Sequence, residues 1–184
     1  MTSEQKIIKT KVGVRRRRSS WATWRARAGS WAAVATASKG AVRDAFDFNG
    51  QVTLVTGAAA GIGFAIAVAF RAAGARVAIG DVREPALTEA AGRLGQDGLF
   101  VRPLDVRGEN SIDGFVEAAE RALGPITIAV ANAGIYPNTP VLDMDVTEWD
   151  RVMETNVCGV FLTGRAAGRA MAARALVSSL GQVQ

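Results

Sequence analysis

The 184-residue sequence has no histidine and only one cysteine and one tyrosine. Without histidine, the chain has no imidazole for a serine-type triad, for general base catalysis or for a metal site, and no metal is expected. One cysteine cannot form a disulfide within the chain, so a reducing, cytoplasmic location is expected. No stretch approaches about 18 uncharged apolar residues, which predicts that no segment spans a membrane.

Lysine is absent after Lys39, and the charges are divided unevenly along the chain. Residues 1–43 carry eleven basic side chains and one acidic side chain, whereas residues 44–184 carry eleven arginines and sixteen acidic side chains. The net charge of +5 therefore combines a strongly basic extension with an acidic body. Because 49% of all residues are apolar, we expect a globular domain over 44–184, preceded by a poorly ordered extension over 1–43.

The basic extension contains four consecutive arginines at 15–18, followed by a segment rich in alanine, arginine and tryptophan. Adjacent like charges repel one another, so this run is expected to stay in solvent. Three interpretations remain open: a poorly ordered extension, a targeting peptide, and an arm that binds nucleic acid or a membrane surface. The sequence favours the poorly ordered extension over both others and gives little support to nucleic-acid binding.

The body alternates short apolar segments with amphipathic ones. Apolar segments predict four buried strands, at 52–55, 76–80, 99–104 and 126–131. Helices are predicted between them; in the first, Ile62, Ile66 and Phe70 recur at four-residue spacing and are expected to face the core. Strands alternating with helices imply right-handed crossovers. The fold class is therefore α/β, a doubly wound parallel sheet of Rossmann type.

A longer helix is predicted to begin at Thr147. Its apolar face is expected to comprise Val152, Met153, Val157, Val160, Phe161 and Leu162. A short apolar stretch follows at 175–177, and the sheet is expected to be incomplete on its C-terminal side. Such a sheet has an unpaired apolar edge, through which the chain is expected to self-associate.

The strongest functional signal is the string Thr-Gly-Ala-Ala-Ala-Gly-Ile-Gly at 56–63, between the first strand and the first helix. Glycine lets the backbone turn sharply and approach a ligand, and a helix N-terminus offers unpaired N–H groups to a phosphate. Asp81 ends the next strand, eighteen residues after Gly63, where a carboxylate can bind ribose hydroxyls. The pattern predicts dinucleotide binding, with purely structural glycines as the alternative.

The glycine spacing, G-x-x-x-G-x-G, resembles that of the short-chain dehydrogenase/reductase family. Three further segments carry the resemblance in the family's order: Asp105-Val106, Asn132-Ala133-Gly134 and Glu154-Thr155-Asn156-Val157. The resemblance implies a partial NAD-binding domain that contacts the cofactor through Gly57, Ala59, Gly61, Ile62, Gly63, Asp81, Asp105, Val106, Asn132, Ala133 and Gly134. NAD is the expected cofactor and NADP is less favoured, because the charge of Asp81 would repel a 2′-phosphate.

The resemblance also implies a reaction, hydride transfer between nicotinamide and an alcohol or carbonyl carbon. Asn156 corresponds to the family's catalytic asparagine. Ser178-Ser179 resembles the Ser-Ser stretch that ends the fifth strand, which would make Ser179 the catalytic serine. An unrelated C-terminal tail is an equally good interpretation of these serines.

The family's catalytic tyrosine, followed four residues later by a lysine, has no counterpart in this chain. Four residues after Tyr136 the chain has Pro140. We therefore expect a truncated oxidoreductase that is inactive alone, whose intact relatives act on a small alcohol or carbonyl substrate. Two alternatives are a non-catalytic module for dinucleotide binding or subunit pairing, and a basic-tailed interaction protein.

Overall fold

The computed structural model describes residues 46–180, with side chains to Arg174. The basic extension and its predicted boundary at residue 43 lie outside the described residues. Four parallel strands form one sheet in the order β3-β2-β1-β4. The strands are β1 Val52–Thr56, β2 Arg76–Asp81, β3 Leu99–Pro103 and β4 Ile128–Val130. All four predicted strands are confirmed, the last one shorter than predicted.

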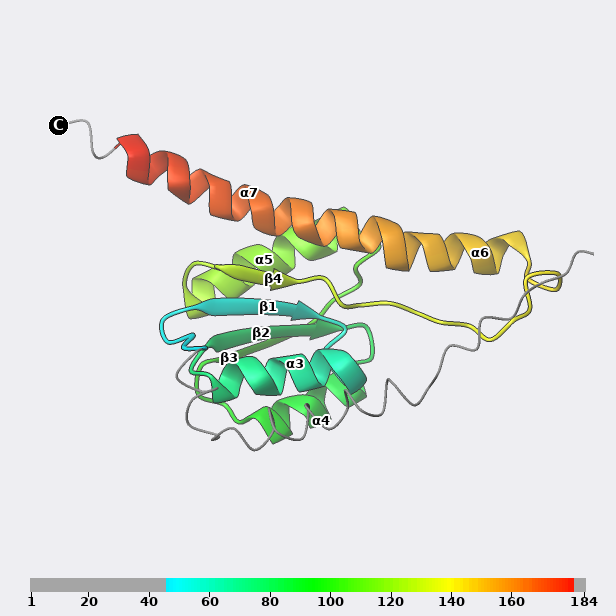
Figure 1. Cartoon of the computed structure of the whole chain (residues 1–184), viewed down its shortest axis with the longest axis horizontal. Helices are drawn as coiled ribbons and strands as arrows, with labels where there is room; N and C mark the ends of the chain where they lie inside the picture. Colours follow the sequence, from blue (N-terminus) through cyan, green and yellow to red (C-terminus); the bar gives the residue numbers. More distant parts are fainter. Residues whose placement is uncertain (1–45, 181–184) are drawn as a thin grey trace, which may run out of the picture. The chain divides into compact units, whose positions relative to one another are not determined.

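Helices cover both faces of the sheet, as the alternating pattern predicts (Figure 1). On one face lie α3 (Gly61–Ala72) and α4 (Glu84–Leu94), and on the other lie α5 (Glu109–Leu123) and a long C-terminal helix. Strand β1 is buried along its whole length. Its Leu54 packs in the core beneath α5, and its Val55 packs in the core beneath α3 and α4. The fold is therefore a doubly wound α/β sheet.

The helical segment after β4 consists of three pieces in sequence (Figure 1). Helix α6 spans Val146–Met153, a π-helical turn η1 spans Glu154–Cys158, and α7 spans Gly159–Leu180. The Asp145 carboxylate caps α6 by accepting a hydrogen bond from the Glu148 N–H at 2.7 Å. The long helix predicted from Thr147 is thus confirmed, with a π-turn that the apolar spacing did not indicate.

The predicted apolar face of this segment is wrong in part. Met153, Val157, Val160 and Phe161 are between 37% and 61% exposed, while the buried residues of α7 are Gly159, Thr163, Ala166 and Ala167. The four apolar residues share the exposed side of the segment, whereas Val152 and Leu162 are half-buried. Small residues also allow a closer approach: a Cβ at Gly159 would lie 2.7 Å from Val106 Cγ2.

Of the two interpretations of the C-terminal segment, the one with a shortened fifth strand before Ser178-Ser179 is wrong, because α7 continues through Leu180. The preceding segment is rich in alanine, which has the highest helix propensity, and extending an existing helix gains one hydrogen bond per residue. In the described part of the chain, β3 and β4 are therefore the two edge strands. Over the same part, no helix is both long enough and apolar enough to cross a bilayer.

Candidate functional site

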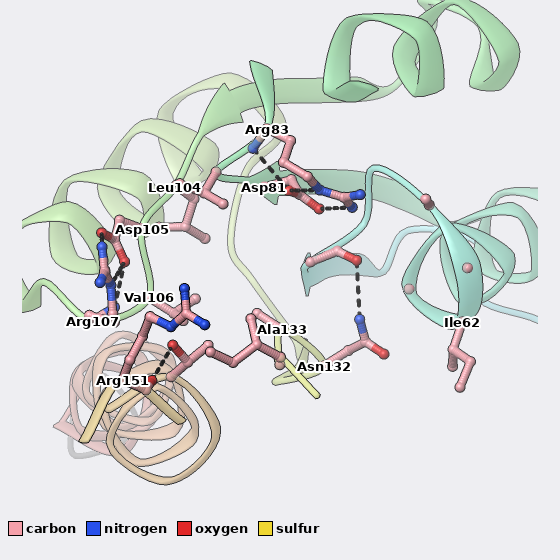
Figure 2. Close-up of a pocket in the computed structure, with 18 residues that line it drawn as sticks. Ile62, Asp81, Arg83, Leu104, Asp105, Val106, Arg107, Asn132, Ala133 and Arg151 are labelled. Carbon is pink, nitrogen blue, oxygen red and sulfur yellow. Dashed lines mark hydrogen bonds and ion pairs between the residues drawn. The ribbon is translucent and has the colours of Figure 1, made fainter. Parts of the chain in front are cut away.

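The carboxyl ends of the four strands border one cavity of about 840 Å³ (Figure 2). This volume falls within the range of about 300–1,000 Å³ that is typical of ligand clefts. Such clefts form in doubly wound sheets where the strand order reverses, here between β1 and β4. Ten of the eleven predicted cofactor-binding residues line it: Gly57, Gly61, Ile62, Gly63, Asp81, Asp105, Val106, Asn132, Ala133 and Gly134. The eleventh, Ala59, is buried behind the cavity wall.

The turn between β1 and α3 requires glycine for two reasons, the backbone conformation at some positions and the lack of space for a side chain at another. Gly57 and Gly61 have φ angles of +65° and +59°, in the left-handed region that other residues avoid. Gly63 has no room for a side chain, because a Cβ would collide with the Gly57 carbonyl and the Asn132 amide. No side chain caps the N-terminus of α3. Its first N–H groups can therefore serve an anion in the cavity.

Thr56 and Asn132 hold the ends of β1 and β4 together. The Thr56 hydroxyl, which is buried, accepts hydrogen bonds from the backbone N–H groups of Asn132 and Ala133 at 3.1 and 3.0 Å. In return, the Asn132 amide donates to the carbonyls of Thr56 and Gly57 at 3.0 and 3.2 Å. The side chain of Asn132 therefore braces the turn, while its backbone borders the cavity.

Asp81 forms a pair with Arg83 at the end of β2 (Figure 2). One carboxylate oxygen accepts from the Arg83 backbone N–H and Nε, and the other accepts from Arg83 Nη2 and the Ala59 N–H. Burial raises the pKa of Asp81, but the hydrogen bonds from Arg83 and Ala59 together outweigh it and lower this pKa below its ordinary value. Asp81 is thus held ionised in the cavity.

Asp105 and Arg107 repeat this arrangement at the end of β3. The Asp105 carboxylate accepts from the Arg107 backbone N–H and, on both oxygens, from its guanidinium at 2.7–3.2 Å. Hydrogen bonds from the Arg107 side chain lower the pKa of Asp105 despite partial burial. Neither arginine was predicted. The available signal was the tripeptide Asp-Val-Arg, which occurs at 81–83 and again at 105–107.

Asn156 lies in the π-turn η1, and both the oxygen and the nitrogen of its side-chain amide are hydrogen-bonded. Its Oδ1 accepts from the Ile135 N–H at 2.8 Å, and its Nδ2 donates to the Ile135 carbonyl at 2.9 Å. Asn156 therefore holds the loop after β4, and its catalytic role stays a prediction. The neighbouring Thr155 and Arg151 line the cavity instead, and neither was predicted (Figure 2).

The remaining predicted residue, Ser179, belongs to the last part of α7, whose side chains lie outside the described residues. Ser179 lies within α7, not at the end of a fifth strand, so the strand position that suggested its role is absent from the described residues. Tyr136 follows β4 and is 89% exposed. Over residues 46–180, no cluster of three or more acidic or cysteine side chains could hold a metal ion.

Comparison with known proteins identifies the family. The sequence model of the short chain dehydrogenase family matches residues 51–178. The chain is 35% identical over 135 residues to 5-keto-D-gluconate 5-reductase of Escherichia coli (strain K12), covering 72% of this chain and 53% of the relative. The chain therefore belongs to the short-chain dehydrogenase family, whose members bind nicotinamide dinucleotides.

Solved structures agree with this assignment. A short-chain type dehydrogenase/reductase from Mycobacterium marinum matches with a TM-score of 0.66 and 39% identity, over 70% of this chain and 52% of that chain. The 3-ketoacyl-(acyl-carrier-protein) reductase from Brucella melitensis, complexed with NADH, matches with a TM-score of 0.62 and 35% identity, over 65% and 49%. The chain spans about half the length of the relatives it matches.

The hydrogen bonds that the Thr56 hydroxyl accepts can be tested with a matched pair of variants on β1. Thr56→Val leaves the Ala133 N–H without its acceptor and removes one of the two acceptors of the Asn132 N–H, which also donates to the Val130 carbonyl; we expect a loss of about 1–3 kcal/mol. Thr53 is also buried in β1, but its hydroxyl has no hydrogen-bond partner among the described residues, so Thr53→Val should be neutral or slightly stabilising. Urea unfolding measures both; an equal loss in the two variants would contradict the role assigned to Thr56.

Proposed function

We propose that this chain binds NAD in the cavity at the strand ends. The observation that carries the proposal is the position of the glycine turn and the uncapped N-terminus of α3 in one cavity with the ionised carboxylate of Asp81. An N-terminus of this kind favours a pyrophosphate, and a carboxylate favours the hydroxyls of a ribose. The residues present therefore fit a dinucleotide.

The remaining predicted residues are assigned to the two halves of the cofactor, the adenine half and the nicotinamide half. In this proposal, Asp105 and Val106 contact the adenine. The segment 132–134 contacts the ribose of the nicotinamide, and Asn132 keeps its backbone in place through the bonds to Thr56 and Gly57. When bound, the nicotinamide ring supplies the hydride acceptor or donor.

The intact protein of this type is proposed to interconvert a secondary alcohol and a ketone in the cytoplasm. Family membership and two relatives support this: one is named a 5-keto-D-gluconate 5-reductase and the other a 3-ketoacyl-(acyl-carrier-protein) reductase. Sugar acids and 3-ketoacyl thioesters are therefore the candidate substrates. Their shared feature is a carbonyl group that hydride addition converts to a hydroxyl.

The charge of Asp81 predicts that NAD binds more tightly than NADP. A 2′-phosphate beside an ionised carboxylate is repelled by about 1 kcal/mol or more, which corresponds to a difference of roughly fivefold to tenfold. Calorimetric titration of the wild-type chain with NAD and NADP measures the difference. Asp81→Asn, which removes the charge but keeps the shape, should reduce it. Equal or tighter binding of NADP by the wild type would contradict the proposal.

The 184-residue chain by itself is predicted not to turn over alcohols or ketones. Removing a hydroxyl proton requires a positioned base, and its loss costs about 10²–10⁴-fold in rate. The chain has no histidine, and its one tyrosine, Tyr136, is exposed and has no lysine near it in sequence. Nicotinamide absorbance with a panel of sugar acids, alcohols and ketones measures turnover. Steady turnover that disappears in Asn156→Ala would show this prediction to be wrong.

Binding without turnover also fits the alternative function, a non-catalytic module for dinucleotide binding or subunit pairing. Self-association is proposed in either case. In the described part of the chain, β4 has a neighbour on one side only, and the exposed apolar side chains of α6, η1 and α7 include Trp149, Val157 and Phe161. Both features favour contact with a second copy.

Self-association is tested by comparing two charged substitutions on the same helix. Phe161→Glu places a charge on the proposed contact surface and should shift the chain toward monomer at micromolar concentration. Ala172→Glu adds the same charge at another exposed position of α7 and should leave association unchanged. Sedimentation velocity measures both. Monomeric wild-type protein, or equal effects of the two substitutions, would contradict the proposal.

A further inference from the structure

All acceptor positions of the Asp81 carboxylate are occupied by the protein itself. An ionised carboxylate has about four lone-pair sites, two on each oxygen. Oδ1 accepts from the Arg83 N–H and Nε at 3.0 and 3.1 Å, and Oδ2 accepts from the Ala59 N–H and Arg83 Nη2 at 3.1 and 3.2 Å. A ribose hydroxyl that approaches Asp81 therefore finds no free acceptor site.

The four donors differ in how easily they can leave. The N–H groups of Ala59 and Arg83 belong to the backbone beside β1 and β2, whose register fixes them. The guanidinium of Arg83, by contrast, is carried on a flexible side chain that is 58% exposed, whereas Asp81 is 5% exposed. The pair is therefore open to solvent on the arginine side only, where water can take over the hydrogen bonds of the guanidinium. The guanidinium is the donor that a ligand can displace.

We propose that Arg83 is a displaceable plug of the ribose subsite, and that it lowers the affinity of the site for ligands that carry a ribose 2′,3′-diol. This inference rests on the proposed dinucleotide function. Arg83 Nε and Nη2 occupy one site on each carboxylate oxygen, so that their departure frees one acceptor on Oδ1 and one on Oδ2. Two adjacent hydroxyls require this same pair of acceptors.

In the free protein, the Arg83 guanidinium closes the ribose subsite by occupying two acceptor sites of Asp81. With Arg83 in place, the ionised carboxylate of Asp81 is paired and its hydrogen bonds are satisfied in the free protein, which offsets the desolvation penalty of its burial before a ligand binds. The ligand must displace the guanidinium, and this competition determines how much of the diol's binding energy is realised. Arg83 is therefore a specificity-determining residue.

The test compares ADP with 2′,3′-dideoxy-ADP, which lacks the diol but has the same adenine and phosphates. The measured quantity is the ratio of the two dissociation constants, because any attraction between Arg83 and the phosphates cancels in it. In Arg83→Met, the advantage of ADP over the dideoxy analogue should rise by about two- to fivefold relative to wild type. Arg83→Lys keeps the charge but lacks the two-pronged donor, and its ratio should also rise.

Arg121→Met is the matched control. Arg121 is 70% exposed, pairs with Glu117 on α5 and does not line the cavity, so its removal changes the net charge equally but should leave the ratio at the wild-type value. Calorimetric titration measures all four proteins, and thermal melting checks that each is folded.

Three outcomes separate this inference from the proposed function. A ratio that rises in both Arg83 variants and stays constant in Arg121→Met supports the plug. A ratio that is unchanged or falls in Arg83→Met, while wild type binds NAD and ADP, overturns the plug and leaves the proposed function intact. If neither the wild type nor Arg121→Met binds NAD or ADP, the proposed function is overturned and the plug with it.

Discussion

Two strand ends that lie 76 residues apart in the sequence are joined by the reciprocal hydrogen bonds of Thr56 and Asn132. The junction brings the glycine turn against the loop after β4, so closely that a Cβ at Gly57 would lie 2.7 Å from Ala133 Cα. Every group that borders the cavity at this end is positioned by that contact. Because the bonds satisfy buried backbone groups as well as side chains, loosening the junction would cost stability and alter the site together.

The electrostatics of the cavity follow from one tripeptide used twice. Asp-Val-Arg follows β2 and β3, which are neighbours in the sheet, so two carboxylate–guanidinium pairs lie along the same edge. Each pair keeps its aspartate ionised while balancing its charge locally. The N-terminus of α3, which no side chain caps, then supplies the attraction for an anion on the other side of Asp81. A dinucleotide carries both a ribose diol and a pyrophosphate, which suits a cavity that has a carboxylate in one part and a helix N-terminus in another.

Helix α7 shows how small residues determine where a helix lies. Its buried face is made of glycine, threonine and alanine, which lets the helix approach Val106 closely. Arg174, six residues before the end of the helix, then ties it to the Glu120 carboxylate and to the Ile126 carbonyl, two residues before β4. Val160 and Phe161 of the same helix face outward, where they are available to another surface, whereas Leu162 and Met171 pack against the core.

The sequence alone determined the alternation of strands and helices and the glycine turn through local spacing, and its family resemblance indicated ten cavity-lining residues. Ile62 shows the limit: its periodicity indicated a core position, yet it is 75% exposed and borders the cavity. Only the tertiary structure decided which residues of α7 are buried and that the Ala59 N–H reaches Asp81, 22 residues further along the chain. Both depend on which surfaces meet, which the period of an isolated segment does not encode.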